Sequence, residues 1–444
     1  MVKVERNIKA NKNVAPIPCR DFHGVLCGME GTEITMDQSA NGINMLGVKI
    51  KNRSSILYLI YRSGGISRKE IANKLNLTPA AITLITTDLI NEGILVESAV
   101  EQNNNRKGRK EILLDINRRK YATIGIYIST NKFQLLCMDL NNTVIFEDTV
   151  FTADCHKKSS AILDKVCAIL EHKLIYYDIV RTRTILGVGV SVKGIVNSRA
   201  GVSINSYNVW EDNVNVVEYI QKRMKVPAIL TNNICSLAHG ESFFANMEHP
   251  KDMLFIKYGP GVGAARVFYQ DTLSVFDFNA IQLGHTIADP NGLICECGNR
   301  GCLETIAGYD AIERNAANIL SGKLTPYLFS YTDGNAENIN MKNIIKAYND
   351  GDKLIEDILD RSIYFLSIAI KNSMCLFDPK SIILYGELFE NEKFRKNLYI
   401  QLSNYSGYEK VTFSSFNLQL ETQGPASTII NFFFENGGLI DIKD

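Results

Sequence analysis

The chain has 444 residues, of which 45% are hydrophobic and 22% charged. This is about three times the roughly 150 residues of one domain, so more than one core is expected, and the composition excludes a long disordered, coiled-coil or collagen-like chain. Lys and Arg number 48, as do Asp and Glu, so the formal net charge is zero. The absence of an apolar run of roughly 18 residues or of an apolar signal core predicts a cytoplasmic protein.

Residues 1–43 carry no sustained hydrophobic period and are expected to form a flexible or loosely docked extension. Cys19, His23 and Cys27 are spaced so that a helix would place them on one face. A fourth ligand is not evident, so we expect no metal site there.

Three short helical patterns follow residue 44. The first is broken at Ser63-Gly64-Gly65, and Ser67 to Glu70 forms a capping box that opens the second. Thr78 can cap the third, with Pro79 at its first helical position. One face of each pattern is apolar, and its members are Ile56, Leu57, Ile60, Ile71, Leu75, Ile82, Ile85 and Leu89. Two short helices joined by a tight turn, after a first helix, predict a helix-turn-helix.

Two apolar runs, Ile94 to Glu97 and Glu111 to Asp115, flank a basic loop that contains glycine. They predict a β-hairpin, and therefore a winged helix-turn-helix over residues 44–118. Residues 44–120 hold 14 Lys or Arg and 7 Asp or Glu, a net charge of +7 that residues 121–444 balance with −7. This distribution is typical of a phosphate-facing module beside an acidic domain.

The outward face of the third predicted helix carries small, polar or aliphatic side chains and no Lys or Arg. Bidentate guanine contacts are therefore not expected, and an A·T-rich double-stranded DNA operator is predicted. The basic loop would follow phosphates or enter a narrow minor groove, unless it is only a solvated loop. The predicted DNA-binding residues are Thr78, Pro79, Ala80, Thr83, Thr87, Arg106, Lys107, Gly108, Arg109 and Lys110. Two-fold DNA half-sites favour a homodimer or higher homo-oligomer.

From Tyr121 onward, apolar strands alternate with helical segments, as in Ala122 to Ile128, Ser160 to Leu174 and Ile185 to Val192. This alternation predicts an α/β architecture. About 320 residues are too many for one sheet and favour two lobes, with a ligand site between them.

Three of the ten cysteines lie within eight residues of one another. His285, Cys295, Cys297 and Cys302 together supply the four soft ligands of a closed tetrahedral zinc site, with glycines that let the chain bend around the metal. Such a site is structural and disfavours hydrolysis by zinc. The alternative is a set of reduced cysteines in a Gly-rich loop.

The string from Gly284 to Glu304 resembles the signature of the ROK family of repressors, uncharacterised reading frames and sugar kinases. The resemblance implies that residues 119–444 form a two-lobed actin-like (ribonuclease-H-like) domain that binds a sugar between its lobes beside a structural zinc. Residues 44–118 look like the winged helix of the repressor branch, including Asn52-Arg53-Ser54 and Gly108-Arg109-Lys110.

The kinase motifs of the family are altered in this sequence. Tyr127-Ile128-Ser129-Thr130 stands where kinases have Asp-x-Gly-Gly-Thr, and Asn233 stands where they have the catalytic Asp. Since an amide cannot accept the sugar proton at neutral pH, no phosphotransfer is expected. Ile383 to Leu388 also lacks the family's Gly-Gly pair, and the glycines of Tyr258 to Ala265 are interpreted as a tight turn between the lobes.

The resemblance also implies which residues contact the sugar. They are Asn208, Asn232, Asn233, Gln282, His285 and Glu304. Two carboxylates of the family are amides here, and amides still donate and accept hydrogen bonds. Trp210, the only tryptophan, either stacks on the sugar ring or fills the core.

These features predict a transcriptional regulator, most simply a repressor, whose DNA binding responds to a sugar or sugar derivative. Two alternatives stay open. One is an active sugar kinase with a vestigial winged helix, and the other is a regulator controlled by a protein partner instead of a sugar.

Overall fold

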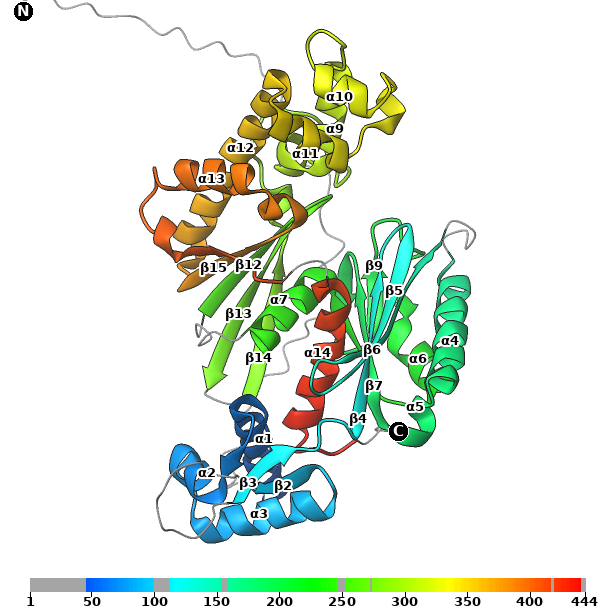
Figure 1. The fold of residues 1–444 in the computed structure, drawn as a ribbon, viewed down its shortest axis with the longest axis vertical. Coiled ribbons are helices and arrows are strands. Elements are labelled where there is room, and N and C mark those ends of the chain that lie inside the picture. The colour runs from blue at the N-terminus through cyan, green and yellow to red at the C-terminus, as the bar shows by residue number, and fades with distance from the viewer. Residues whose placement is uncertain are drawn as a thin grey trace, which may run out of the picture. The chain divides into compact units, whose positions relative to one another are not determined.

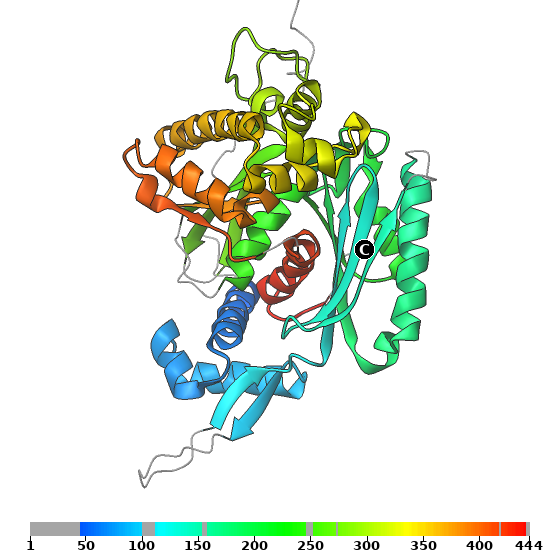
Figure 2. The ribbon, with the colours of Figure 1, turned by 45° about the horizontal axis from the view of Figure 1, so that its top comes forward.

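The structure, a computed structural model, describes residues 45–99, 112–152, 158–245, 252–271, 274–416 and 419–440 (Figures 1 and 2). The five predicted wing residues at 106–110 and the Cys19, His23 and Cys27 set lie outside this range. None of the helices in the described ranges combines the length and the apolar character that crossing a membrane requires.

The first helices and strands along the chain form a winged helix-turn-helix. Helices α1 (Met45–Ser63), α2 (Arg68–Leu75) and α3 (Pro79–Asn91) are followed by strands β2 (Leu95–Ala99) and β3 (Ile112–Ile116). The short strand β1 (Ile66–Ser67) pairs with β3, giving the antiparallel order β1-β3-β2. Both predicted caps are present, because Ser67 and Glu70 form the capping box and Thr78 Oγ1 accepts from the Ala81 N–H.

The first α/β lobe is built on a mixed sheet of order β11-β7-β4-β5-β6. Its strands are β4 (Tyr121–Ile128), β5 (Lys132–Asp139), β6 (Val144–Phe151), β7 (Thr184–Val192) and β11 (Ala228–Asn232). Helices α4 (Ser159–Tyr176), α5 (Ile179–Thr182) and α6 (Val216–Met224) cover one face, toward which Ile124, Ile126 and Ile128 point. A small sheet of β8 (Ile195–Asn197), β9 (Val202–Asn205) and β10 (Val214–Asn215) lies beside it.

The second lobe repeats the same topology with the order β14-β13-β12-β15-β16. Its strands are β12 (Asp252–Tyr258), β13 (Val262–Asp271), β14 (Ser274–Ile281), β15 (Ser381–Tyr385) and β16 (Val411–Phe413). Its helices are α8 (Glu304–Ala307), α9 (Tyr309–Asn318), α10 (Pro326–Tyr331), α11 (Met341–Asp350), α12 (Lys353–Phe377) and α13 (Glu392–Leu402). In each lobe an antiparallel meander is extended by two parallel strands, so the predicted two-lobed α/β domain is confirmed.

Helices α7 (Asn233–Phe244) and α14 (Leu420–Glu435) pack against each other beside the first sheet (Figure 1). Glycine permits the close approach, since a Cβ on Gly189 of β7 would lie 1.8 Å from the Pro425 carbonyl oxygen in α14. His239 Nδ1 lies 2.6 Å from Ser427 Oγ across the α7–α14 contact. Burial lowers the pKa of His239 to about 3, so its ring is neutral at physiological pH.

Trp210 belongs to the core of the first lobe. Its side chain is 5% exposed, and its Nε1–H donates to Ser203 Oγ at 3.1 Å. The interpretation of Trp210 as a platform for a sugar ring is therefore wrong. Its indole N–H has found a partner inside the lobe, as buried tryptophans usually do.

Candidate functional site

The outward face of α3 is a surface of small and uncharged side chains. Thr78, Pro79, Ala80, Thr83 and Thr87 are all exposed, as the sequence predicts. The opposite face holds Ile82, Ile85 and Leu89 in the core. Leu84, between the exposed threonines, is 66% exposed. These side chains offer methyl and hydroxyl groups to a partner, and none of them is charged.

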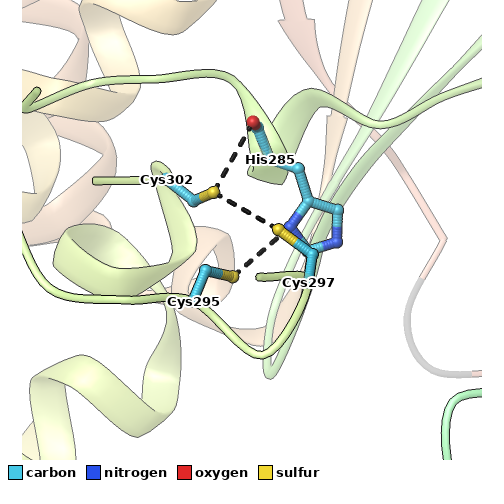
Figure 3. Close-up of side chains that lie close together, drawn as sticks. All are labelled: His285, Cys295, Cys297 and Cys302. Carbon is cyan, nitrogen blue, oxygen red and sulfur yellow. Dashed lines mark hydrogen bonds between the residues drawn. The ribbon is translucent and has the colours of Figure 1, made fainter. Parts of the chain in front are cut away.

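The four predicted metal ligands converge in one loop (Figure 3). His285 Nδ1 lies 3.6 Å from Cys295 Sγ, and Cys297 Sγ lies 3.6 Å from Cys302 Sγ. All four ligand atoms are within 4.8 Å of one another. Bonds of about 2.0–2.3 Å to a tetrahedral zinc would separate the ligand atoms by about 3.5–3.8 Å, so the set fits that ion.

The backbone of this loop explains the glycines between the ligands. Gly301 has a φ of +74°, and a Cβ there would lie 1.6 Å from the Asp289 carbonyl oxygen. Only glycine fits that position. The N–H of Asn299, which donates to Cys297, lowers the pKa of that thiol, so the exposed member of the set is the one most readily present as thiolate.

The same loop places two of the predicted sugar contacts side by side. Glu304 Oε2 lies 3.9 Å from His285 Nδ1, while Glu304 Oε1 accepts from the Val262 N–H at 2.7 Å. Val262 follows the turn at Gly259 to Gly261, as the interpretation of those glycines as a tight turn requires. The loop and the turn therefore fix the carboxylate of Glu304 together.

The two asparagines at the start of α7 have different surroundings. Asn232 caps the helix, with its Oδ1 accepting from the Ile234 N–H at 2.8 Å and its Nδ2 donating to the Gly194 carbonyl oxygen. Both the oxygen and the nitrogen of its side-chain amide are thus already hydrogen-bonded within the protein. Asn233 is buried and donates a hydrogen bond to Tyr127. Burial raises the pKa of Tyr127, while the charge of Lys257 and the hydrogen bonds from Asn233 and Lys257 act in the opposite direction. Asn233 and Tyr127, the two altered kinase positions, therefore contact each other.

The remaining predicted sugar contacts, Gln282 and Asn208, are exposed. Asn208 follows Tyr207, and both residues have positive φ angles, of 70° and 47°. Burial raises the pKa of Tyr207, and charges on Cys297 and Glu304 add to the rise. The Tyr207 phenol therefore lies near the loop of residues 285–302 that carries the four predicted metal ligands, here called the metal loop. Sequence reasoning missed Tyr207, and its position directly before Asn208 is the signal that could have found it.

Sequence reasoning also missed a cluster of ion pairs next to the glycine turn. Glu421 in α14 lies 3.9 Å from Lys257 Nζ in β12 and 3.8 Å from Lys132 Nζ in β5. The signal in the sequence is a lysine between Ile256 and Tyr258, two fully buried residues of the strand Asp252–Tyr258.

Comparisons with known proteins agree with this fold. The sequence model of the ROK family matches residues 123–417, and that of the MarR family matches residues 51–106. A solved structure described as a ROK family transcriptional regulator, homolog of the E. coli MLC protein, covers 88% of this chain and 98% of its own with a TM-score of 0.75 and 24% identity. The winged helix-turn-helix and the two-lobed domain thus occur together in a solved relative.

Two curated relatives carry the names of different sugars. The N-acetylglucosamine repressor of Escherichia coli O6:H1 is 28% identical over 78% of this chain and 82% of its own length. The xylose repressor of Caldicellulosiruptor bescii is 25% identical over 76% of this chain and 85% of its own length. Their names differ in the sugar, so similarity at this level does not identify an effector.

Proposed function

The chain belongs to the ROK family, and from that premise we propose that it is a transcriptional repressor whose DNA binding responds to a sugar or sugar derivative. The observation that carries the proposal is the uncharged, exposed face of α3 in a winged helix-turn-helix that is joined to a ROK domain. An enzyme of the family would need no such face. The names of the relatives support the same function.

In this proposal α3 enters the major groove of an A·T-rich operator. Thr83 and Thr87 offer hydroxyl and methyl groups to base edges, and Leu84 offers an apolar contact to thymine methyls. Arg106, Lys107, Arg109 and Lys110 of the wing, together with Gly108, follow the backbone or the minor groove. The protein binds as a homodimer or higher homo-oligomer, one winged helix to each half-site.

We assign the effector site to the residues around the glycine turn. His285 and Glu304 are adjacent there, Asn233 approaches from α7, and Asn208 and Gln282 supply exposed amides. Asn232 contributes by holding the start of α7, since its amide is occupied. A zinc ion held by His285, Cys295, Cys297 and Cys302 would supply a fixed tetrahedral crosslink that orients the loop.

Selection of DNA ligands from a random pool by the full-length protein tests the DNA half of this function. We expect enrichment of an A·T-rich inverted repeat, with an affinity that falls steeply between about 50 and 200 mM salt because phosphate contacts release counterions. Failure to enrich any motif, or binding without salt dependence, would contradict DNA recognition by this face.

The kinase alternative has less support. Tyr127 and Asn233 replace acidic residues and contact each other, so neither presents a base. Beside Tyr385 to Glu387, a cavity of about 50 Å³, bordered by Phe389 and Phe416, has room for only a few water molecules. The proposal is therefore that the protein transfers no phosphate.

A coupled ATP assay over a panel of hexoses and N-acetylhexosamines is expected to show no turnover above background. The Asn233→Asp variant should stay inactive as well, because it restores one carboxylate but not the phosphate loop at Tyr127. Turnover by the wild-type chain would establish the kinase alternative. Turnover only in Asn233→Asp would show that the nucleotide site is intact, and would contradict the proposed loss of the phosphate loop.

Control by a protein partner instead of a sugar is the second alternative. Calorimetry that detects no heat with any sugar or sugar phosphate, while DNA binding is intact, would favour it.

A further inference from the structure

Helix α14 begins beside a group of three charges between the two sheets, of which Lys257 and Glu421 are largely buried and Lys132 is half-buried. Glu421, in its first turn, faces Lys257 of β12 in the second sheet and Lys132 of β5 in the first. The side chains of Lys257 and Glu421 are only 13% and 11% exposed. A buried charge is costly unless it is paired, so these two residues are held by each other.

The same group of charges reaches the proposed effector site. Lys257 Nζ lies 6.0 Å from the centre of the Tyr127 ring, and Tyr127 contacts Asn233. Burial alone would lower the pKa of Lys257, but Tyr127 and Glu421 raise it above its ordinary value, so the ammonium stays charged. A displacement of Asn233 by a bound sugar would therefore alter the surroundings of Lys257 and its pairing with Glu421.

The other end of α14 belongs to the winged helix-turn-helix. Ile429, Ile430, Phe433 and Phe434 share one hydrophobic core with the apolar faces of α1, α2 and α3. Tyr58 of α1 donates a hydrogen bond to Asn431 Oδ1, and its ring packs against Phe434 with centroids 5.3 Å apart. The sixteen residues of α14 span about 24 Å from one end to the other.

One arginine joins the end of α14 to α3. Arg53 of α1 is buried, and its Nε donates to the Gly437 carbonyl oxygen at 2.6 Å, just after α14. Its guanidinium also pairs with both carboxylate oxygens of Glu92, the C-cap of α3. A shift of α14 along or about its axis would thus be transmitted by the buried Arg53 side chain, through its bidentate contact with the half-exposed Glu92, to the helix that faces DNA.

We propose that α14 is the element that transmits effector binding to the winged helix, and that the Lys257–Glu421 pair is where the effector domain holds it. The proposal rests on the proposed function, and it adds the regulatory connection between the two sites. Lys257 and Glu421 act here as positioning residues for α14.

The variant that tests this replaces both partners, Lys257→Met with Glu421→Leu, because replacing one alone would leave an unpaired buried charge. A matched control is Arg266→Met with Asp252→Leu. That pair joins β13 to β12 in the same sheet, its side chains are 22% and 16% exposed, and its two hydrogen bonds run between those strands and not to α14. The single variant Glu421→Gln serves as a second test if the double variant does not fold.

Hydrogen exchange of the full-length protein without any sugar is the first readout, and it does not depend on the effector. We expect the Lys257→Met/Glu421→Leu variant to exchange faster than wild type in α1 and α3, and the control variant to match wild type there. Unchanged exchange in both helices would overturn the proposal. A change of equal size in the control would also overturn it.

DNA release is the second readout, measured with N-acetylglucosamine or xylose as the probe. The Lys257→Met/Glu421→Leu variant should keep the wild-type affinities for DNA alone and for the sugar within about threefold, while a wild-type sugar response of about tenfold or more falls below about twofold. A full response in the variant, or loss of sugar binding by it, would overturn the relay. If the wild type itself does not respond, it is the sugar-responsive function that fails, and hydrogen exchange still decides the relay.

Discussion

Replacing Thr83 with glutamate is expected to weaken binding to the selected DNA by about 100-fold. The side chain lies on the exposed face of α3, so a carboxylate there would meet base acceptors and the negative phosphates at close range. A loss of about 2.7 kcal/mol corresponds to that factor. Glutamate is a better helix former than threonine, so the fold should be unaffected and the melting temperature unchanged within about 2 °C.

The matched control is Ser330→Glu, which adds the same charge at an exposed position of α10 in the second lobe. Its DNA affinity, measured by fluorescence anisotropy, should remain within about twofold of wild type. Equal losses in the two variants would mean that net charge, not the α3 face, controls binding. Full affinity in Thr83→Glu would remove α3 from the DNA interface.

Replacing Cys302 with serine is expected to abolish metal binding and sugar binding together. The Cys302 side chain is fully buried, with its sulfur 3.6 Å from that of Cys297, and a structural zinc does not tolerate the loss of one thiolate. Because His285 and Glu304 flank the same loop, its disorder would separate two of the proposed sugar contacts. Elemental analysis should fall from about one zinc per chain to less than about a tenth.

DNA binding by the Cys302→Ser protein should be retained, since the winged helix shares its core with α14 and, among the residues that the structure describes, with none of the metal loop. The control is Cys375→Ser, an exposed cysteine at the end of α12, which should keep both the metal and the sugar affinity. Retention of a full equivalent of zinc by Cys302→Ser would show that the four residues are not the ligand set. Normal sugar binding after zinc loss would separate the loop from the effector site.

The winged helix and the metal loop could be predicted because their signals are local in sequence. A capping box needs only Ser67 and Glu70, and four soft ligands within one short string already define a tetrahedral set. The α/β alternation was equally readable, because buried strands are continuous apolar runs, as in β4.

The features that sequence reasoning missed depend on residues far apart in the chain. Glu421 lies 164 positions from Lys257, and nothing in either local pattern names the other. The dual role of α14, in the core of the winged helix and in the charge cluster, follows only from the packing of the whole chain. For Trp210 the functional interpretation as a sugar-stacking residue was wrong. Its side chain is buried in the core of the first lobe, as most tryptophan side chains are.

Sugar-responsive DNA binding is tested most directly by the anisotropy of labelled operator DNA bound to the full-length protein while sugars and sugar phosphates are added one at a time. We expect that at least one of them, which also raises the melting temperature of the free protein, changes the DNA affinity by about tenfold or more. DNA binding that no member of the panel alters, although the operator is bound specifically, would contradict a sugar-responsive regulator.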